Sequence, residues 1–231
     1  MKKIAMLLVV MLVASGVVYS QAFKVTSVGG YLGVHGLLGP TGATEVVSKG
    51  GAGMGFGPFI GVGGKVKASM ASMPKIEWTG RVGYDIFQGK GGTPEKTNTE
   101  GLLGIGLGAQ YGLKPMMMGS KEVKPYVAGE LQINMFMPSF DGYTVTPTKN
   151  TGTRVGLGLG GGVDYPLSGK MSLDVGLKLS IANLIGKGSA AADIVAYDAA
   201  PATTQTEGTW MHLSLNIGVN FSLASAMGGG M

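Results

Sequence analysis

The chain has 231 residues, with 18 Lys and Arg against 13 Asp and Glu, a formal net charge of +5 and no cysteine. The basic residues are spread along the chain, which excludes the clustered basic surface of a nucleic-acid-binding protein. The lack of cysteine excludes disulfides and thiolate metal ligands. Glycine is unusually frequent, with 43 residues, but from Leu103 to Leu113 the glycines alternate with apolar residues, which indicates one face of a β-strand.

The N-terminus has the pattern of a secretory signal peptide. Lys2 and Lys3 precede an apolar run from Ile4 to Val13, and small residues follow. We expect cleavage between Ser20 and Ala22, so that residues 1–22 form the leader. The alternative is a retained helical anchor, but Ile4 to Tyr19 is only 16 residues, shorter than the roughly 20 that a spanning helix needs.

Eight later segments alternate between apolar residues and polar residues or glycine. This period of two predicts β-strands with one apolar and one polar face. The predicted strands are Lys24 to Leu38, Met54 to Ala68, Ile76 to Phe87, Leu102 to Leu113, Pro125 to Met137, Thr153 to Tyr165, Lys170 to Leu184 and Thr209 to Leu223.

The clearest alternation, from Met211 to Leu223, continues without a break over 13 residues. Soluble strands usually have roughly 5 to 6 residues, whereas a tilted strand that crosses a bilayer needs roughly 9 to 11. An even number of long amphipathic strands predicts an all-β fold, an eight-stranded antiparallel up-and-down transmembrane β-barrel. We assign residues 23–224 to this domain and residues 225–231 to a short C-terminal tail.

The connections between the predicted strands alternate in length, which is typical of outer-membrane barrels with long external loops and short periplasmic turns. Both termini would then be periplasmic. The long connections are Gly39 to Gly53, Gln88 to Gly101, Pro138 to Gly152 and Ile185 to Gly208, and the shorter ones are Ser69 to Lys75, Lys114 to Lys124 and Pro166 to Gly169.

One turn predicts a register. A three-residue loop Leu167-Ser168-Gly169, with Gly169 in the left-handed conformation, is a favoured hairpin connection. It would place Gly162 opposite Asp174 and Gly158 opposite Lys178 on the inner face, so that glycines make room for charged side chains.

Aromatic residues at strand ends on the lipid face are expected to form two interfacial girdles. The candidates at the periplasmic rim are Trp78, Tyr111, Tyr165 and Phe221, and those at the outer rim are Phe56 and Tyr84.

Charged residues share the glycine phase of the strands and would therefore face the lumen. An eight-stranded barrel is only wide enough for side chains to fill it, so we expect a paired lumenal polar network rather than a proton or ion pathway. Its predicted members are Glu77, Arg81, Asp85, Glu130, Arg154, Asp164, Asp174 and Lys178.

Two histidines, His35 and His212, also fall on the lumenal phase near the outer rim of the first and last strands. Closure of the barrel makes these strands neighbours, so we expect the two rings to lie close together. Paired imidazoles can bind a divalent metal or titrate near neutral pH. No third ligand is evident from the sequence, so we interpret the pair as part of a polar lining and assign no metal.

Two motif matches point to other chemistry and are set aside. Gly156-x-Gly158-x-x-Gly161 fits the dinucleotide fingerprint, but no helix follows it. His212-Leu213-Ser214 is similar to the His-x-Ser pair of outer-membrane lipid A deacylases, but no acidic residue follows Ser214. We therefore predict no catalytic residues, no enzymatic activity and no cofactor.

The leader, the eight strands and the stretches KPYVAGELQINMF (Lys124 to Phe136) and RVGLGLGGGVDYPLSGKMSLDVGLKL (Arg154 to Leu179) resemble the small OmpA/OmpX-type outer-membrane β-barrel family over essentially the whole mature chain. One departure is that Ala224 to Met231 follow the last strand, where such barrels commonly finish on an aromatic residue. The resemblance implies a location in the outer membrane of a Gram-negative-type bacterium.

We therefore expect a monomer, in contact with outer-membrane lipid, with a structural or surface-interaction role in adhesion or the envelope. Its external loops, which are rich in Thr, Gly, Pro and Lys, would bind surface ligands, and no nucleic acid is expected as a partner. The alternative is a narrow porin-like channel or carrier for small solutes.

Overall fold

The computed structural model describes residues 23–39, 59–91, 96–140, 151–188 and 207–223. The described residues form nine strands and no helix long and apolar enough to span a bilayer. The strands are β1 (Phe23–Gly39), β2 (Phe59–Met70), β3 (Ile76–Gly91), β4 (Lys96–Gly112), β5 (Met116–Met118), β6 (Lys121–Phe140), β7 (Gly152–Pro166), β8 (Met171–Ile185) and β9 (Met211–Ser222).

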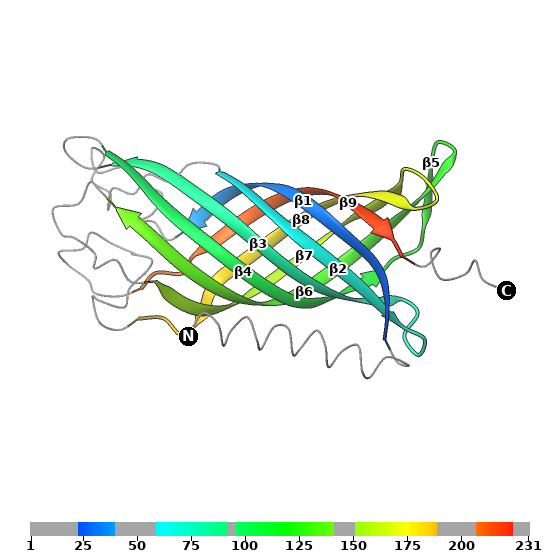
Figure 1. Cartoon of the computed structure of the whole chain (residues 1–231), viewed down its shortest axis with the longest axis horizontal. Helices are drawn as coiled ribbons and strands as arrows, with labels where there is room; N and C mark the ends of the chain where they lie inside the picture. The colour runs from blue at the N-terminus through cyan, green and yellow to red at the C-terminus, as the bar shows by residue number, and fades with distance from the viewer. Residues whose placement is uncertain (1–22, 40–58, 92–95, 141–150, 189–206, 224–231) are drawn as a thin grey trace.

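Eight of these strands form a closed antiparallel ring, seen from the side in Figure 1. Each strand pairs with the next along the chain, except that β4 pairs with β6 because β5 is a short extension. The ring closes between β1 and β9, where Leu32 lies opposite Ile217. The predicted fold class, an eight-stranded antiparallel up-and-down barrel, is confirmed.

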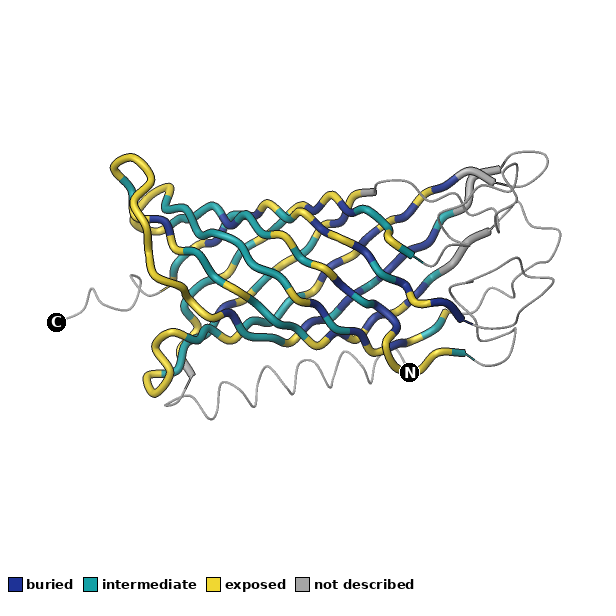
Figure 2. Tube along the Cα trace, turned by 180° about the vertical axis from the view of Figure 1, so that it is seen from behind, coloured by how far each residue is buried: buried dark blue, intermediate teal, exposed yellow. Residues whose placement is uncertain are grey.

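The alternation in the sequence becomes an apolar outside and a polar inside. Along β9, Leu213, Leu215 and Ile217 are exposed on the outer surface, whereas His212 and Ser214 between them are buried in the lumen. Figure 2 shows this change from exposed to buried along the strands. An exposed aliphatic belt around a fully hydrogen-bonded ring is the arrangement that a hydrocarbon environment requires.

We call the end with the short connections the turn end and the opposite end the loop end. At the loop end, most of the predicted loop Gln88 to Gly101 is strand, because β3 continues to Gly91, opposite Lys96 at the start of β4. In the same way β6 continues to Phe140, within the predicted loop Pro138 to Gly152. These strand ends lack a continuous apolar face. The alternation in the sequence therefore stops before the backbone pairing of the strands does. The predicted first residues of β2, 54–58, lie outside the described residues.

At the turn end, a small hairpin accounts for the long connection between β4 and β6. Met116–Met118 pairs with the first residues of β6 around the two-residue turn Gly119-Ser120. Gly119 has a φ of 65°, as the first central residue of the favoured Gly-X hairpin turn requires. Its Gly-Ser sequence was the signal for this hairpin, and our sequence analysis missed it.

The register predicted for the β7–β8 hairpin is wrong by two residues. Asp174 lies opposite Asp164 and Lys178 lies opposite Gly160, rather than Gly162 and Gly158. The turn closes with Met171 N–H donating to Ser168 O at 3.4 Å, and Gly169 has no positive φ. Because a shift of two residues preserves the phase of a strand, the same side chains still face the lumen.

Candidate functional site

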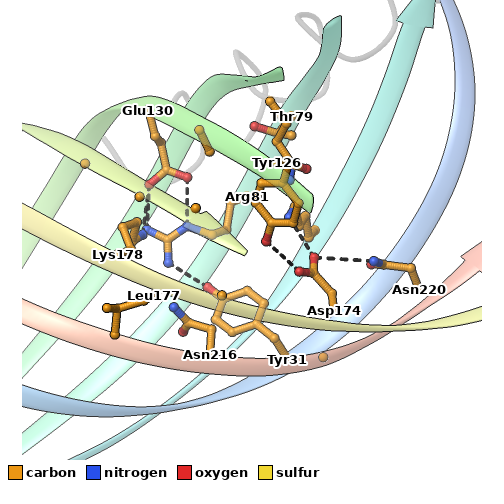
Figure 3. A pocket seen from close by; sticks show the side chains of 18 of the residues that line it. Tyr31, Thr79, Arg81, Tyr126, Glu130, Asp174, Leu177, Lys178, Asn216 and Asn220 are labelled. Carbon is orange, nitrogen blue, oxygen red and sulfur yellow. Dashed lines mark hydrogen bonds and ion pairs between the residues drawn. The ribbon is translucent and has the colours of Figure 1, made fainter. Parts of the chain in front are cut away.

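The centre of the lumen is crossed by an ion-pair network around Glu130 of β6 (Figure 3). Arg81 of β3 donates from Nε and Nη2 to the two Glu130 oxygens at 3.0 and 2.8 Å. Lys178 of β8 donates to Glu130 Oε1 at 3.1 Å, and Gln132 Nε2 donates to the same oxygen at 2.7 Å. One carboxylate thus joins cations from opposite sides of the barrel, as a satisfied buried network requires.

Glycines on the lumenal phase make this network sterically feasible. A Cβ on Gly158 of β7 would lie 2.9 Å from Gln132 Nε2 and 3.1 Å from Lys178 Cδ. A Cβ on Gly106 of β4 would lie 2.6 Å from Glu130 Oε2. Long charged side chains therefore lie directly against the glycine backbone of β4 and β7, where a larger residue would clash with them.

A second cluster lies nearer the turn end, around Asp164 and Asp174. Lys65 of β2 donates to Asp174 Oδ2 at 2.9 Å, and Lys67 donates to Asp164 Oδ2 at 2.6 Å. Tyr126 O–H donates to Asp174 Oδ1 at 2.6 Å. Our sequence analysis did not name these lysines. Their alternation with the outward-facing Val66 nevertheless indicates that both face the lumen.

At the loop end, Arg154 is paired with a residue that the sequence placed in a loop. Its Nη2 donates to Glu207 Oε2 at 2.7 Å, and Asn183 Nδ2 donates to Glu207 Oε1 at 2.8 Å. Glu207 is buried, with 7% of its surface exposed. It follows a long polar segment with no alternation, so nothing in the sequence indicates that it enters the barrel.

At the loop end, an aromatic cluster also fills the lumen, next to the buried polar side chain of Asn183, whose Oδ1 accepts from Trp210 N–H. Phe87 and Phe136 pack edge-to-face on Trp210, with ring centroids 4.8 and 5.6 Å away. All three side chains have 0% exposure. We call this cluster of Phe87, Phe136 and Trp210 the aromatic cap. Our sequence analysis did not identify this cluster.

The two histidines meet next to the aromatic cap at the seam between β1 and β9. Their ring centroids are 5.7 Å apart and the rings are stacked. Asp85 of β3 is the third member of this group, with Oδ1 3.6 Å from His35 Nε2. The sequence places the two histidines near each other, but it does not reveal Asp85 as a neighbour, because β3 is two strands from β1 and their relative height depends on register.

The other predicted positions differ in how they are used. Glu77 faces the turn end, is half-exposed and lies 4.0 Å from Lys67, so it is peripheral to the network. Trp78, Tyr84, Tyr111 and Phe221 are exposed on the outer surface, and Tyr165 is partly covered, with Lys121 Nζ 5.0 Å from its ring centroid. β3 continues beyond Tyr84 to Gly91, so its place at a rim stays a prediction, and Phe56 lies outside the described residues.

The cavities in the described part of the barrel include one at its centre and one at the turn end. The central one, of about 90 Å³, is lined by residues of the central network, among them Tyr31, Arg81 and Glu130. The other, of about 320 Å³, is at the turn end and is lined by polar side chains such as Lys67, Glu77 and Asp164. The larger space is therefore at the end opposite the aromatic cap.

The closed ring, the apolar exterior and the polar interior define a small transmembrane β-barrel. The crystal structure of Neisserial surface protein A (NspA) is similar, with a TM-score of 0.50 and 16% identity over 87% of this chain and 97% of NspA. The N-terminal β-barrel domain of Pseudomonas aeruginosa OprF has a TM-score of 0.42 and 12% identity over 86% of this chain and 100% of that domain.

A de novo designed transmembrane β-barrel has a TM-score of 0.35 and 12% identity over 87% of this chain and 98% of the design. No family model matches the chain, and no curated protein has a significantly similar sequence. At such low identity the similarity to NspA concerns the fold, which is that of the small OmpA/OmpX-type barrels.

Proposed function

We propose that this protein is a monomeric outer-membrane barrel that acts as a non-catalytic scaffold, with adhesion or envelope contacts made by its external segments. The observation that carries the proposal is the filled lumen. The aromatic cap is fully buried at the loop end, and the Arg81–Glu130–Lys178 network crosses the centre. A filled, rigid barrel suits the presentation of loops better than the passage of solutes.

The predicted leader and the exposed aliphatic belt support an outer-membrane location. NspA, which has the similar fold, is described as a surface protein, and this supports a role at the cell surface here. We expect fractionation to place the processed protein in the outer membrane, resistant to carbonate extraction and faster on gels when unheated. Recovery from soluble periplasm would contradict the proposed location.

The surface role can be tested by replacing residues 40–58 and 189–206 with short Gly-Ser connections. Cells that produce the unaltered protein should adhere to host cells or extracellular matrix, and the replacement variant should lose this adhesion while its barrel keeps its heat-dependent gel shift. If cells with the unaltered protein adhere no better than cells without it, the adhesion role is wrong.

The channel alternative makes an opposite prediction in planar bilayers. We expect no stepwise conductance from the purified protein under conditions in which a general porin conducts. Discrete conductance steps that disappear in heat-denatured samples would contradict the scaffold proposal and favour the channel.

A further inference from the structure

We propose that His35, His212 and Asp85 form a binding site for one divalent transition-metal ion, with Zn²⁺ as the fitting probe. The three side chains are all buried, and one ligand atom from each lies within 4.8 Å of the other two. Two imidazoles and one carboxylate are a donor set that proteins use for zinc and for non-haem iron. None of the three residues takes part in the Arg81–Glu130–Lys178 network.

The geometry requires only a small contraction to hold an ion. Three atoms that are mutually within 4.8 Å share a point about 2.8 Å or less from each of them, whereas zinc bonds to N and O ligands are roughly 2.0 to 2.2 Å long. Each side chain would therefore move by less than about 1 Å. Water can fill the fourth position of a tetrahedral ion.

Neighbouring atoms favour this donor set. Asp85 Oδ1 and His212 Nδ1 are buried and have no hydrogen-bond partner among the described residues. His35 Nδ1 is 3.1 Å from the Ser214 hydroxyl, and in the tautomer that donates from Nδ1 to this oxygen, Nε2 presents its lone pair towards Asp85. Such an outer hydrogen bond orients metal-binding histidines in general.

Two glycines, Gly33 and Gly61, leave space around this site that a side chain would otherwise fill. A Cβ on Gly61 of β2 would lie 2.8 Å from His35 Nε2, and a Cβ on Gly33 of β1 would lie 2.6 Å from Asn216 Oδ1. The two nearby cations, Arg81 and Lys178, are both paired with Glu130. Glu130 offsets one of their two positive charges, so they oppose a bound cation less than two unpaired cations would.

A bound ion would join β9, β1 and β3 and so cross the seam at which the barrel closes. Ligand binding to the folded state alone stabilises that state, so the metal would act as a clasp between the first and last strands. This role deepens the scaffold proposal without depending on the adhesion or conductance results.

The test uses the protein purified from membranes in detergent without a histidine tag and stripped with EDTA. The chain has two histidines in total, so both ring signals in an NMR spectrum report on this site. We expect one zinc per chain, a rise in the thermal unfolding midpoint, and shifts of both histidine signals that saturate together. Absence of stoichiometric zinc, or movement of only one histidine signal, would overturn the proposal.

Variants separate this site from general zinc binding to lumenal carboxylates. D85N and H212Q should each weaken zinc binding by more than about tenfold, since even outer-shell changes cost roughly 10- to 100-fold. Glu77→Gln is the matched control, because Glu77 lies on the same strand and the same lumenal phase but near the turn end. It should change affinity by less than about twofold, and an equal loss in E77Q would contradict the assignment.

Discussion

Glu130 is the residue on which the central network depends, because one carboxylate accepts from both Arg81 and Lys178. Removal of one partner of a buried ion pair leaves an uncompensated charge and costs roughly 3 to 5 kcal/mol. We therefore expect E130Q to lower the free energy of unfolding by about this amount. Urea titration of the detergent-solubilised barrel, followed by tryptophan fluorescence, measures the change.

Glu77→Gln is again the control, since its side chain is 39% exposed and lies 4.0 Å from Lys67. Exposed ion pairs of this kind contribute about 0 to 1 kcal/mol. Equal destabilisation by E77Q and E130Q would mean that the Glu130 ion pairs do not make the stabilising contribution proposed for them.

For individual residues, the sequence predicts whether a side chain faces the lumen or the lipid better than it predicts the contacts of that side chain. The period of two places Arg81, Glu130 and Lys178 in the lumen, and the structure joins them. Their partnership depends on the stagger of β3, β6 and β8 around the ring, which no single strand encodes. The Arg154–Glu207 pair was missed for a different reason, since Glu207 lies outside the strands and no alternation marks it.

Strand β9 offers adjacent residues in opposite environments, lipid and lumen. Leu215 is exposed on the outer surface between Val34 of β1 and Leu177 of β8. Leu215→Arg should cost roughly 2 to 4 kcal/mol near the bilayer midplane. Asn216 faces the lumen, and its Oδ1 has no hydrogen-bond partner among the described residues.

Asn216→Ala should therefore cost less than about 1 kcal/mol. Reversible unfolding from lipid vesicles would compare both variants with the unaltered protein. If the two substitutions are equally costly, the orientation of β9 is wrong.

The elements themselves were largely predictable, because the apolar stripe that faces lipid has to continue across the bilayer. Strand ends beyond that stripe were not predictable in this way, since Gly91 and Lys96 are paired by the backbone without apolar side chains. The β7–β8 register failed because a turn of Leu, Ser, Gly and Lys is compatible with more than one closure, whereas the Gly119 turn had a clear signal.

The whole molecule depends on the closure between β1 and β9, and the absence of cysteine makes this closure testable. Leu32 and Ile217 are opposed and exposed on the outer surface. Opposed residues of antiparallel strands have Cα atoms roughly 4.5 to 5.5 Å apart, within the range that disulfides span. Leu32→Cys combined with Ile217→Cys should form an intramolecular disulfide on mild oxidation, identified by mass spectrometry after proteolysis.

The comparison variant combines Leu32→Cys with Leu107→Cys on β4, which β2 and β3 separate from β1. Leu107 is also exposed on the outer surface, so access of the oxidant is matched. This pair should stay reduced within one chain. A failure of the Leu32 and Ile217 pair to cross-link in the folded barrel would contradict the closed ring.

The difference between the two ends of the lumen gives the molecule a direction. A polar cavity lined by Lys67 and Asp164 lies at the turn end, whereas the buried rings of Phe87, Phe136 and Trp210 fill the lumen at the other end. The two ends of the barrel therefore differ in how completely side chains fill the lumen. In the proposed scaffold, charged side chains would face the turn end while the packed rings at the loop end oppose the passage of solutes across the membrane.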